Sequence, residues 1–217
     1  VIELGAAQLK GDAATLGLKD GPGVGGAEPL PLERLQALGQ RGVLVGVGVP
    51  TADTHGLAVN PFGAHFAEVE VNTRTGEVKV LRYVAAQDSG RVMNRLTYDN
   101  QVFGGITQGM GLALTEERVA DAAHRGRVLN ANLHDYKVPT ALDAVPAPVC
   151  LPIDPKDTVC NSTGAKGLGE PALIPSAAAI ANAVAHALGR RVAHSPITPA
   201  RVLTALSAPA SKSEARS

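Results

Sequence analysis

A short glycine-rich segment with one carboxylate, "TGAKGLGEP" at residues 163–171, is the stretch of this sequence best suited to chemistry. Glycine has no Cβ, so its three glycines let the main chain turn tightly or approach another group closely. Proline suits the first turn of a helix, so Pro171 predicts a helix that starts at or near Glu170. The amides of residues 167–169 would then form an anion cradle beside a helix N-terminus.

Two roles fit Glu170 at this position, and the segment alone leaves both open. As a charge at a helix N-terminus, it would stabilise the helix dipole by about 0.3–1 kcal/mol. The alternative is a chemical role for this carboxylate at the mouth of the loop. The segment is not a Walker A loop, because Lys166 lacks the following Ser or Thr, and it lacks the G-x-G-x-x-G order of dinucleotide folds.

The other residues with catalytic potential show no matching constellation. Ser162 and Ser176 are not in a G-x-S-x-G elbow. Cys150 and Cys160 do not form a CxxC pair, so we expect two incidental thiols, with a disulfide as the alternative. The six histidines show no metal-ligand spacing and are His55, His65, His124, His134, His186 and His194.

The composition excludes several classes of protein. Twenty basic and twenty acidic residues among 217 leave no net charge to attract nucleic acid or an anionic membrane. Hydrophobic residues make up 45% but aromatic residues only 3%, so the core must consist of Ala, Val, Leu and Ile. No apolar run approaches the roughly 18 residues of a membrane span, and no signal-peptide pattern opens the chain, which favours the cytoplasm.

The elements that would position the glycine-rich segment are strands and helices in irregular order, which favours an α+β fold. Alternating apolar residues around the turn "NTRTGE" predict a β-hairpin over 63–88. Apolar residues recurring every four positions predict a helix over 96–119, capped by Asn94 or Thr97. A second helix is expected over 171–189, closed by Gly189, and a short strand and small helix after it.

Four glycines, Gly104, Gly105, Gly109 and Gly111, lie inside the helix predicted over 96–119. Each costs a helix about 1 kcal/mol relative to alanine, so some group must approach the helix backbone closely. That group is either a neighbouring helix or strand, or a bulky ligand.

Three segments, "AQDSGRVMNRLTYDNQVFGGITQGMGLALTEE", "NLHDYKVPT" and "TGAKGLGEPALIPSAAAIANAVAHALG", occur in this order. Together they resemble the molybdenum-binding subunit of the xanthine dehydrogenase and aldehyde oxidase family, most closely the bacterial aldehyde oxidoreductases in which it is a separate chain. The resemblance implies the C-terminal molybdopterin-binding domain over 61–206. Residues 1–60, with one short helical candidate over 32–38, would be an irregular lead-in, and 207–217 a disordered tail.

The resemblance implies that Glu170 acts as general base toward a hydroxide bound to molybdenum, in the oxidation of an aldehyde or aromatic N-heterocycle with oxygen derived from water. It implies a molybdopterin cofactor, in the cytosine dinucleotide form, pressed against the glycine-containing helix. Arg95 stands where relatives commonly have proline. The residues matched to cofactor contacts are Arg91, Val92, Met93, Asn94, Arg95, Leu96, Thr97, Gln101, Gln108, Lys166, Gly167, Leu168 and Gly169.

The resemblance also implies partner subunits that carry FAD and 2Fe-2S clusters, and we expect the chain alone to be inactive. Export to the periplasm with a partner subunit stays open beside the cytoplasm. The alternatives are a cofactor-free fragment that only docks to partner subunits, and a generic phosphate- or nucleotide-binding module that uses "GAKGLG".

Overall fold

The computed structural model describes residues 2–10, 12, 14, 17–19, 23–25, 30–31, 34–35, 56–153 and 157–209. They belong to two compact units, Val1–Pro50 and Thr51–Ser217. Of the tail predicted to be disordered, residues 210–217 lie outside the described part.

The first unit contains a helix that the sequence did not predict. Helix α1 spans Ile2–Leu9, where Leu and Ala favour a helix despite the many glycines and prolines that follow. Its Ala6 is buried, as is Leu35. Three short antiparallel strands follow in the order β1 (Gly17–Lys19), β2 (Gly23–Gly25) and β3 (Leu30–Pro31). The helical candidate over 32–38 lies outside the described residues except for Arg34 and Leu35.

The predicted hairpin is confirmed in the second unit. Strand β4 (Phe62–Val71) pairs antiparallel with β5 (Val78–Asp88). In the turn between them, Asn72 Oδ1 accepts hydrogen bonds from the amides of Arg74 and Thr75. Strand β8 (Val149–Ile153) then joins β5 in parallel, which gives the strand order β4-β5-β8.

Helix α3 (Arg95–Met110) continues into a π-helical turn, η3 (Gly111–Thr115). Asn94 caps it as predicted, because its Oδ1 accepts the Thr97 amide at 3.1 Å. The predicted end at Val119 is wrong by four residues, since Asn130 bonds both the Val119 amide and the Glu117 carbonyl and holds this segment extended. A small ribbon follows, formed by β6 (Ala120–Asp121), η4 (Ala122–His124) and β7 (Arg127–Val128).

Helix α4 (Ile174–Leu188) ends at Gly189 in the left-handed conformation, as predicted. Its predicted start near Glu170 is wrong, because Pro175 rather than Pro171 occupies the first turn. Residues 170–173 form a separate turn. Helix α5 (Pro199–Ser207) is the predicted last helix, whereas the described residues 190–198 contain no strand where a short one was expected.

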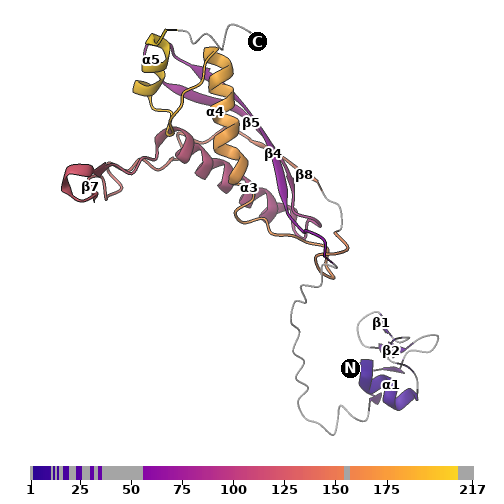
Figure 1. Cartoon of the computed structure of the whole chain (residues 1–217). Helices are drawn as coiled ribbons and strands as arrows, with labels where there is room; N and C mark the ends of the chain where they lie inside the picture. Colours follow the sequence, from indigo (N-terminus) through magenta and orange to yellow (C-terminus); the bar gives the residue numbers. More distant parts are fainter. Residues whose placement is uncertain are drawn as a thin grey trace. The chain divides into compact units, whose positions relative to one another are not determined.

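The core lies between the sheet and the helices. Helix α4 packs across one face of β4 and also contacts α3 (Figure 1). The buried aliphatic residues include Val102, Ile106, Ile180 and Val184, together with Tyr83 and Tyr98. The opposite face of the sheet carries exposed Phe62, Phe66, Val149, Leu151 and Ile153. This α+β architecture agrees with the sequence, and among the described helices none is long and apolar enough to cross a membrane.

Candidate cofactor-binding site

Two segments far apart in the sequence meet beyond the end of β5. The Arg91 amide donates to the Gly164 carbonyl at 2.8 Å, and the Lys166 amide donates to the Ser89 carbonyl at 2.7 Å. Gly90 lies between these bonds with φ of +63°, and a Cβ there would collide with the Gly164 carbonyl. The fold therefore requires glycine at this crossing, which joins residues 89–98 to residues 164–170.

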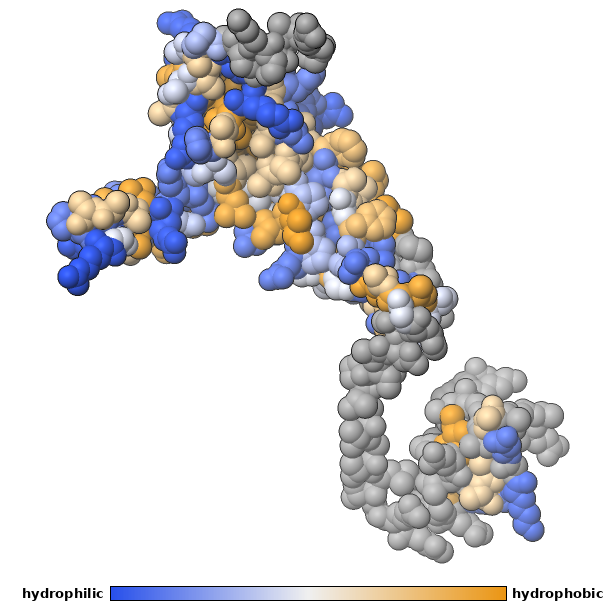
Figure 2. Space-filling view, in the orientation of Figure 1, coloured by the Kyte–Doolittle hydropathy of each residue, from blue (hydrophilic) through white to orange (hydrophobic). Residues whose placement is uncertain are grey.

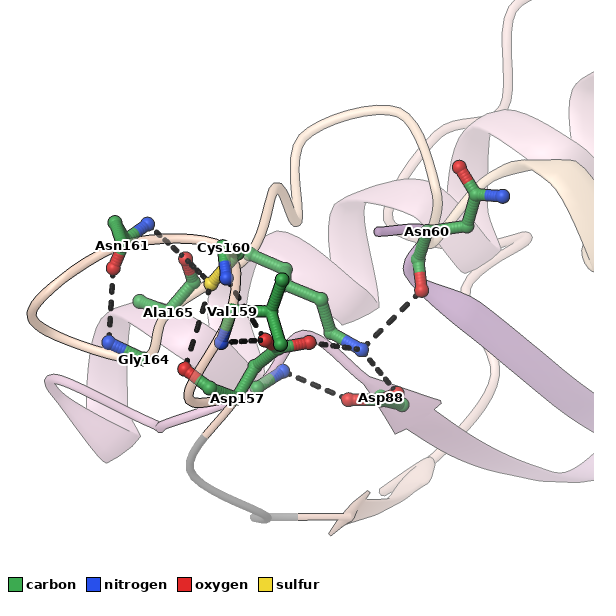
Figure 3. A network of polar contacts seen from close by, with 10 residues as sticks. Asn60, Asp88, Asp157, Val159, Cys160, Asn161, Gly164 and Ala165 are labelled. Carbon is green, nitrogen blue, oxygen red and sulfur yellow. Dashed lines mark hydrogen bonds and ion pairs between the residues drawn. The ribbon is translucent and has the colours of Figure 1, made fainter. Parts of the chain in front are cut away.

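The Lys166 side chain reinforces the crossing. Its Nζ lies 2.6 Å from Asp88 Oδ2, with side-chain exposures of only 9% and 5% for the two residues. The ammonium also donates to the Asn60 carbonyl at 3.2 Å and lies 3.8 Å from Asp157 Oδ2, and the other oxygen of Asp88 accepts the Gly90 amide (Figure 3). The resemblance matched Lys166 to a cofactor contact. In the structure, the Lys166 ammonium instead pairs with the Asp88 carboxylate inside the protein.

A hollow of about 170 Å³ lies at this crossing. It is lined by six residues matched to cofactor contacts, Arg91, Met93, Asn94, Thr97, Lys166 and Leu168, and by three that the sequence did not single out, Ser89, Tyr98 and Ala165. Ser89 is 3% exposed, and its hydroxyl has no hydrogen-bond partner among the described residues. Burial raises the pKa of Tyr98, and the nearby Ser89 hydroxyl opposes this only in part. Ser89 and Tyr98 thus form a buried polar pair in the wall of the hollow.

Three residues of the segment 91–97 make contacts within the protein: Val92, Asn94 and Arg95. Asn94 caps α3. The Arg95 guanidinium donates hydrogen bonds to both carboxylate oxygens of Asp99, at 2.9 and 2.8 Å, and to the Cys150 carbonyl. Its hydrogen bonds lower the pKa of Asp99. Val92 packs against the core, whereas Leu96 is exposed.

One face of α3 stays open from the hollow onward. Thr97, Gln101, Gly104 and Gln108 follow one another at spacings of three or four, so they share this face, and all four are exposed. Gln101 Nε2 donates to the Gly169 carbonyl at 3.1 Å, which ties the face to the residue before Glu170. Gln108 lies further along the same face and is not part of the hollow.

The glycines of α3 serve two purposes. At Gly105 an added Cβ would lie 2.7 Å from the Ala172 carbonyl carbon, and at Gly109 it would collide with Ser176. Of the two alternatives that the sequence left open, packing against a neighbouring segment therefore explains both positions. Gly104 is different, because an added Cβ would meet nothing within 4 Å.

Gly167 and Gly169 resemble Gly104 in this respect. Neither has a left-handed φ, and an added Cβ at either would meet nothing within 4 Å. Neither the backbone conformation nor packing among the described residues requires glycine here. The space in front of them is open to another molecule.

Glu170 is exposed at the end of this open strip. Its carbonyl accepts the Leu173 amide at 2.8 Å, and α4 begins only after that turn. The expected anion cradle at a helix N-terminus is therefore absent, because residues 167–169 do not adjoin a helix start. On the face seen in Figure 2, hydrophobic residues are exposed in the region of α3. Leu96 in α3 and Ile174 at the start of α4 are both exposed.

The sequence model of the molybdopterin cofactor-binding domain family matches residues 34–145. This range includes the segment 91–97 and α3, and it ends before residues 163–171. The chain belongs to this family and is a molybdenum-binding domain of the xanthine dehydrogenase and aldehyde oxidoreductase type.

Similar proteins agree with this assignment. The chain is 41% identical over 145 residues to the aldehyde oxidoreductase molybdenum-binding subunit PaoC of Escherichia coli K12, which covers 67% of the chain and 20% of that protein. It is 40% identical over 141 residues to the putative xanthine dehydrogenase molybdenum-binding subunit XdhA of the same strain, covering 65% of the chain and 18% of that protein. The chain thus spans about a fifth of the length of these relatives.

The fold matches solved structures as well. Quinoline 2-oxidoreductase from Pseudomonas putida 86 superimposes with a TM-score of 0.76 at 24% identity, over 96% of this chain and 28% of that one. At this identity the match concerns the fold alone.

Proposed function

We propose that residues 61–206 are the C-terminal part of a molybdenum hydroxylase, in which the exposed face of α3 and the adjoining hollow hold molybdopterin and Glu170 is the general base. The reaction would be oxidation of an aldehyde or aromatic N-heterocycle with oxygen derived from water. The single observation that carries this proposal is the continuous open strip from the hollow, along Thr97, Gln101 and Gly104, to the loop that bears Glu170.

The residues of the strip fit such a cofactor. Gly104, Gly167 and Gly169 leave the main chain accessible where no internal packing needs it. Arg91 is exposed at its edge, and among the described residues its guanidinium forms no ion pair, so it is available to a phosphate of a dinucleotide. We propose the cytosine dinucleotide form on the resemblance alone.

The bound cofactor would supply the two-electron redox chemistry, and the chain's own residues would position it and move the proton. Glu170 would accept the proton of the water-derived oxygen, which requires the carboxylate to lie within hydrogen-bond reach of that oxygen. Gly169 directly before it adds no side chain to obstruct the approach, and the bond from Gln101 fixes the main chain at that point.

We further propose that turnover needs the rest of the molybdenum subunit and partner subunits that carry iron–sulfur clusters and FAD. The names of PaoC and XdhA describe subunits, and the chain spans about a fifth of their length. By itself the chain is then inactive.

The test is Glu170→Gln in the assembled enzyme, with Glu68→Gln as control, because Glu68 is an exposed residue of β4 whose one ion pair among the described residues is with Arg82. Loss of a general base should lower turnover of an aldehyde or heterocycle by about 10²–10⁴-fold, with molybdenum content unchanged. Near wild-type turnover of Glu170→Gln at full molybdenum content would remove Glu170 from this role.

A further inference from the structure

The start of α4, which follows the Glu170 loop, is held from behind by a buried polar cluster that the proposed chemistry does not use. His65 lies on the inner face of β4, and its Nδ1 is 3.1 Å from the Tyr83 hydroxyl and 3.2 Å from Ser176 Oγ. All three side chains are buried. The Tyr83 and His65 rings meet edge to face at 5.6 Å, which fixes the imidazole in place.

Ser176 connects this cluster to the loop. It lies in the first turn of α4, is fully buried, and donates its hydroxyl proton to the Ala172 carbonyl at 3.2 Å. A hydroxyl has one proton, so with that proton on Ala172 the Ser176 oxygen can bond His65 only as an acceptor, in the tautomer that carries its proton on Nδ1. The chain of bonds therefore runs from the sheet through Ser176 to a residue two positions after Glu170.

The groups that face the imidazole are neutral at neutral pH. Burial lowers the pKa of His65 below its ordinary value of 6.5, and the Gln87 side chain offsets this in part. Burial raises the pKa of Tyr83 to about 12. The contacts of His65 with Tyr83 and with Ser176 are therefore hydrogen bonds between uncharged groups, and their strength depends on geometry.

The other side of the same turn is fixed by α3. Gly105 and Gly109 bring the α3 backbone against Ala172 and Ser176, and Gln101 bonds the Gly169 carbonyl. Residues 169–176 are thus held between α3 and the His65 cluster. If the contacts of His65 are lost, the loop is held only by its contacts with α3.

We propose that His65 is a positioning residue, which sets the place of the Glu170 loop by fixing the first turn of α4 through Ser176. The link to catalysis rests on the proposed role of Glu170, whereas the positioning itself does not.

Hydrogen exchange of the chain without cofactor tests this directly. The Leu173 amide bonds the Glu170 carbonyl and the Ser176 amide bonds the Leu173 carbonyl, so both report order in the turn. The Val202 amide in α5, bonded to the Thr198 carbonyl, reports on a separate element. Asparagine places its terminal amide near the position of Nδ1, whereas glutamine places it near Nε2, so His65→Asn and His65→Gln form a matched pair.

In His65→Gln, exchange at Leu173 and Ser176 should accelerate about tenfold relative to Val202, and His65→Asn should restore most of the protection. Unchanged exchange at these two amides in His65→Gln would overturn the proposal. Equal acceleration in both variants would overturn it too, because the Nδ1 contact would then be irrelevant.

Ser176→Ala provides an independent route if a His65 variant fails to fold. It removes the other partner and should accelerate exchange at Leu173 to a similar extent, and protection equal to wild type would refute the link through Ser176. Because exchange is measured without turnover, its outcome is separate from that of Glu170→Gln. Exchange can reveal a loose turn even if Glu170 proves catalytically unimportant. Equally, Glu170→Gln can abolish turnover even if the exchange of the turn is unchanged in the His65 variants.

Discussion

Adjacent glycines of α3 offer a sharp test of the packing described above. Gly104 and Gly105 are neighbours in the same helix, yet an added Cβ meets nothing at the first and the main chain of Ala172 at the second. We therefore compare Gly104→Ala with Gly105→Ala. The chemical change is identical, and only the surroundings differ.

The magnitudes follow from two opposing contributions. Alanine favours a helix interior over glycine by about 1 kcal/mol at either position. At Gly105 the new methyl group would lie 2.7 and 2.8 Å from the carbonyl carbon and oxygen of Ala172, and a backbone cannot rotate away as a side chain can. Overpacking of this kind costs about 1–3 kcal/mol. Because the helix preference cancels, the two variants should differ in unfolding free energy by about 1–3 kcal/mol.

Urea unfolding followed by circular dichroism measures this difference. Gly104→Ala should raise the free energy of unfolding by about 1 kcal/mol, and Gly105→Ala should leave it unchanged or lower it by up to about 2 kcal/mol. Equal stabilisation by both substitutions would refute the packing of α3 against Ala172. Equal destabilisation would show that Gly104 is not open.

Two further predictions concern buried polar groups. Lys166→Met should lower the free energy of unfolding by about 3–5 kcal/mol, because it leaves the Asp88 carboxylate buried without its partner. In urea unfolding, the double variant with Asp88→Asn should lose less unfolding free energy than the sum of the two single variants. Losses that simply add would contradict the pairing. Stability should fall as pH drops below 6.5, since the unfolded state takes up a proton that buried His65 resists, with a slope of at most about 1.4 kcal/mol per pH unit. His65→Asn should lose that slope, and an identical pH dependence of wild type and variant would assign it to another group.

The local elements could largely be predicted, because their signals are local. Alternation and a turn sequence define the hairpin, and Asn94 and Gly189 mark helix ends by well-understood capping. The start of α4 could not be predicted, because Pro171 and Pro175 both suit a first turn. The structure distinguishes them, because the Leu173 amide bonds the Glu170 carbonyl in a separate turn before α4 begins.

The site was less accessible to sequence reasoning, since its defining contacts are long-range. A glycine within a helix looks the same in the sequence whether it faces Ala172, as Gly105 does, or open space, as Gly104 does. The resemblance matched Lys166 to a cofactor contact, and nothing near Lys166 in the sequence reveals Asp88 as its partner. Residues 89–98 and 164–170 could be placed near each other only through the family resemblance, which matched residues of both segments to cofactor contacts. No pattern of spacing in the sequence indicates that they meet.

The parallel pairing of β5 with β8 has a consequence for how the site forms. The hairpin pairs Val71 with Val78 across a short turn, whereas Val84 pairs with Val149 only after a long stretch of chain has been brought back. Closing a long loop costs more entropy and slows folding, so local contacts come first. The segments that frame the hollow follow β5 and β8, so we expect the site to be completed after the hairpin has formed.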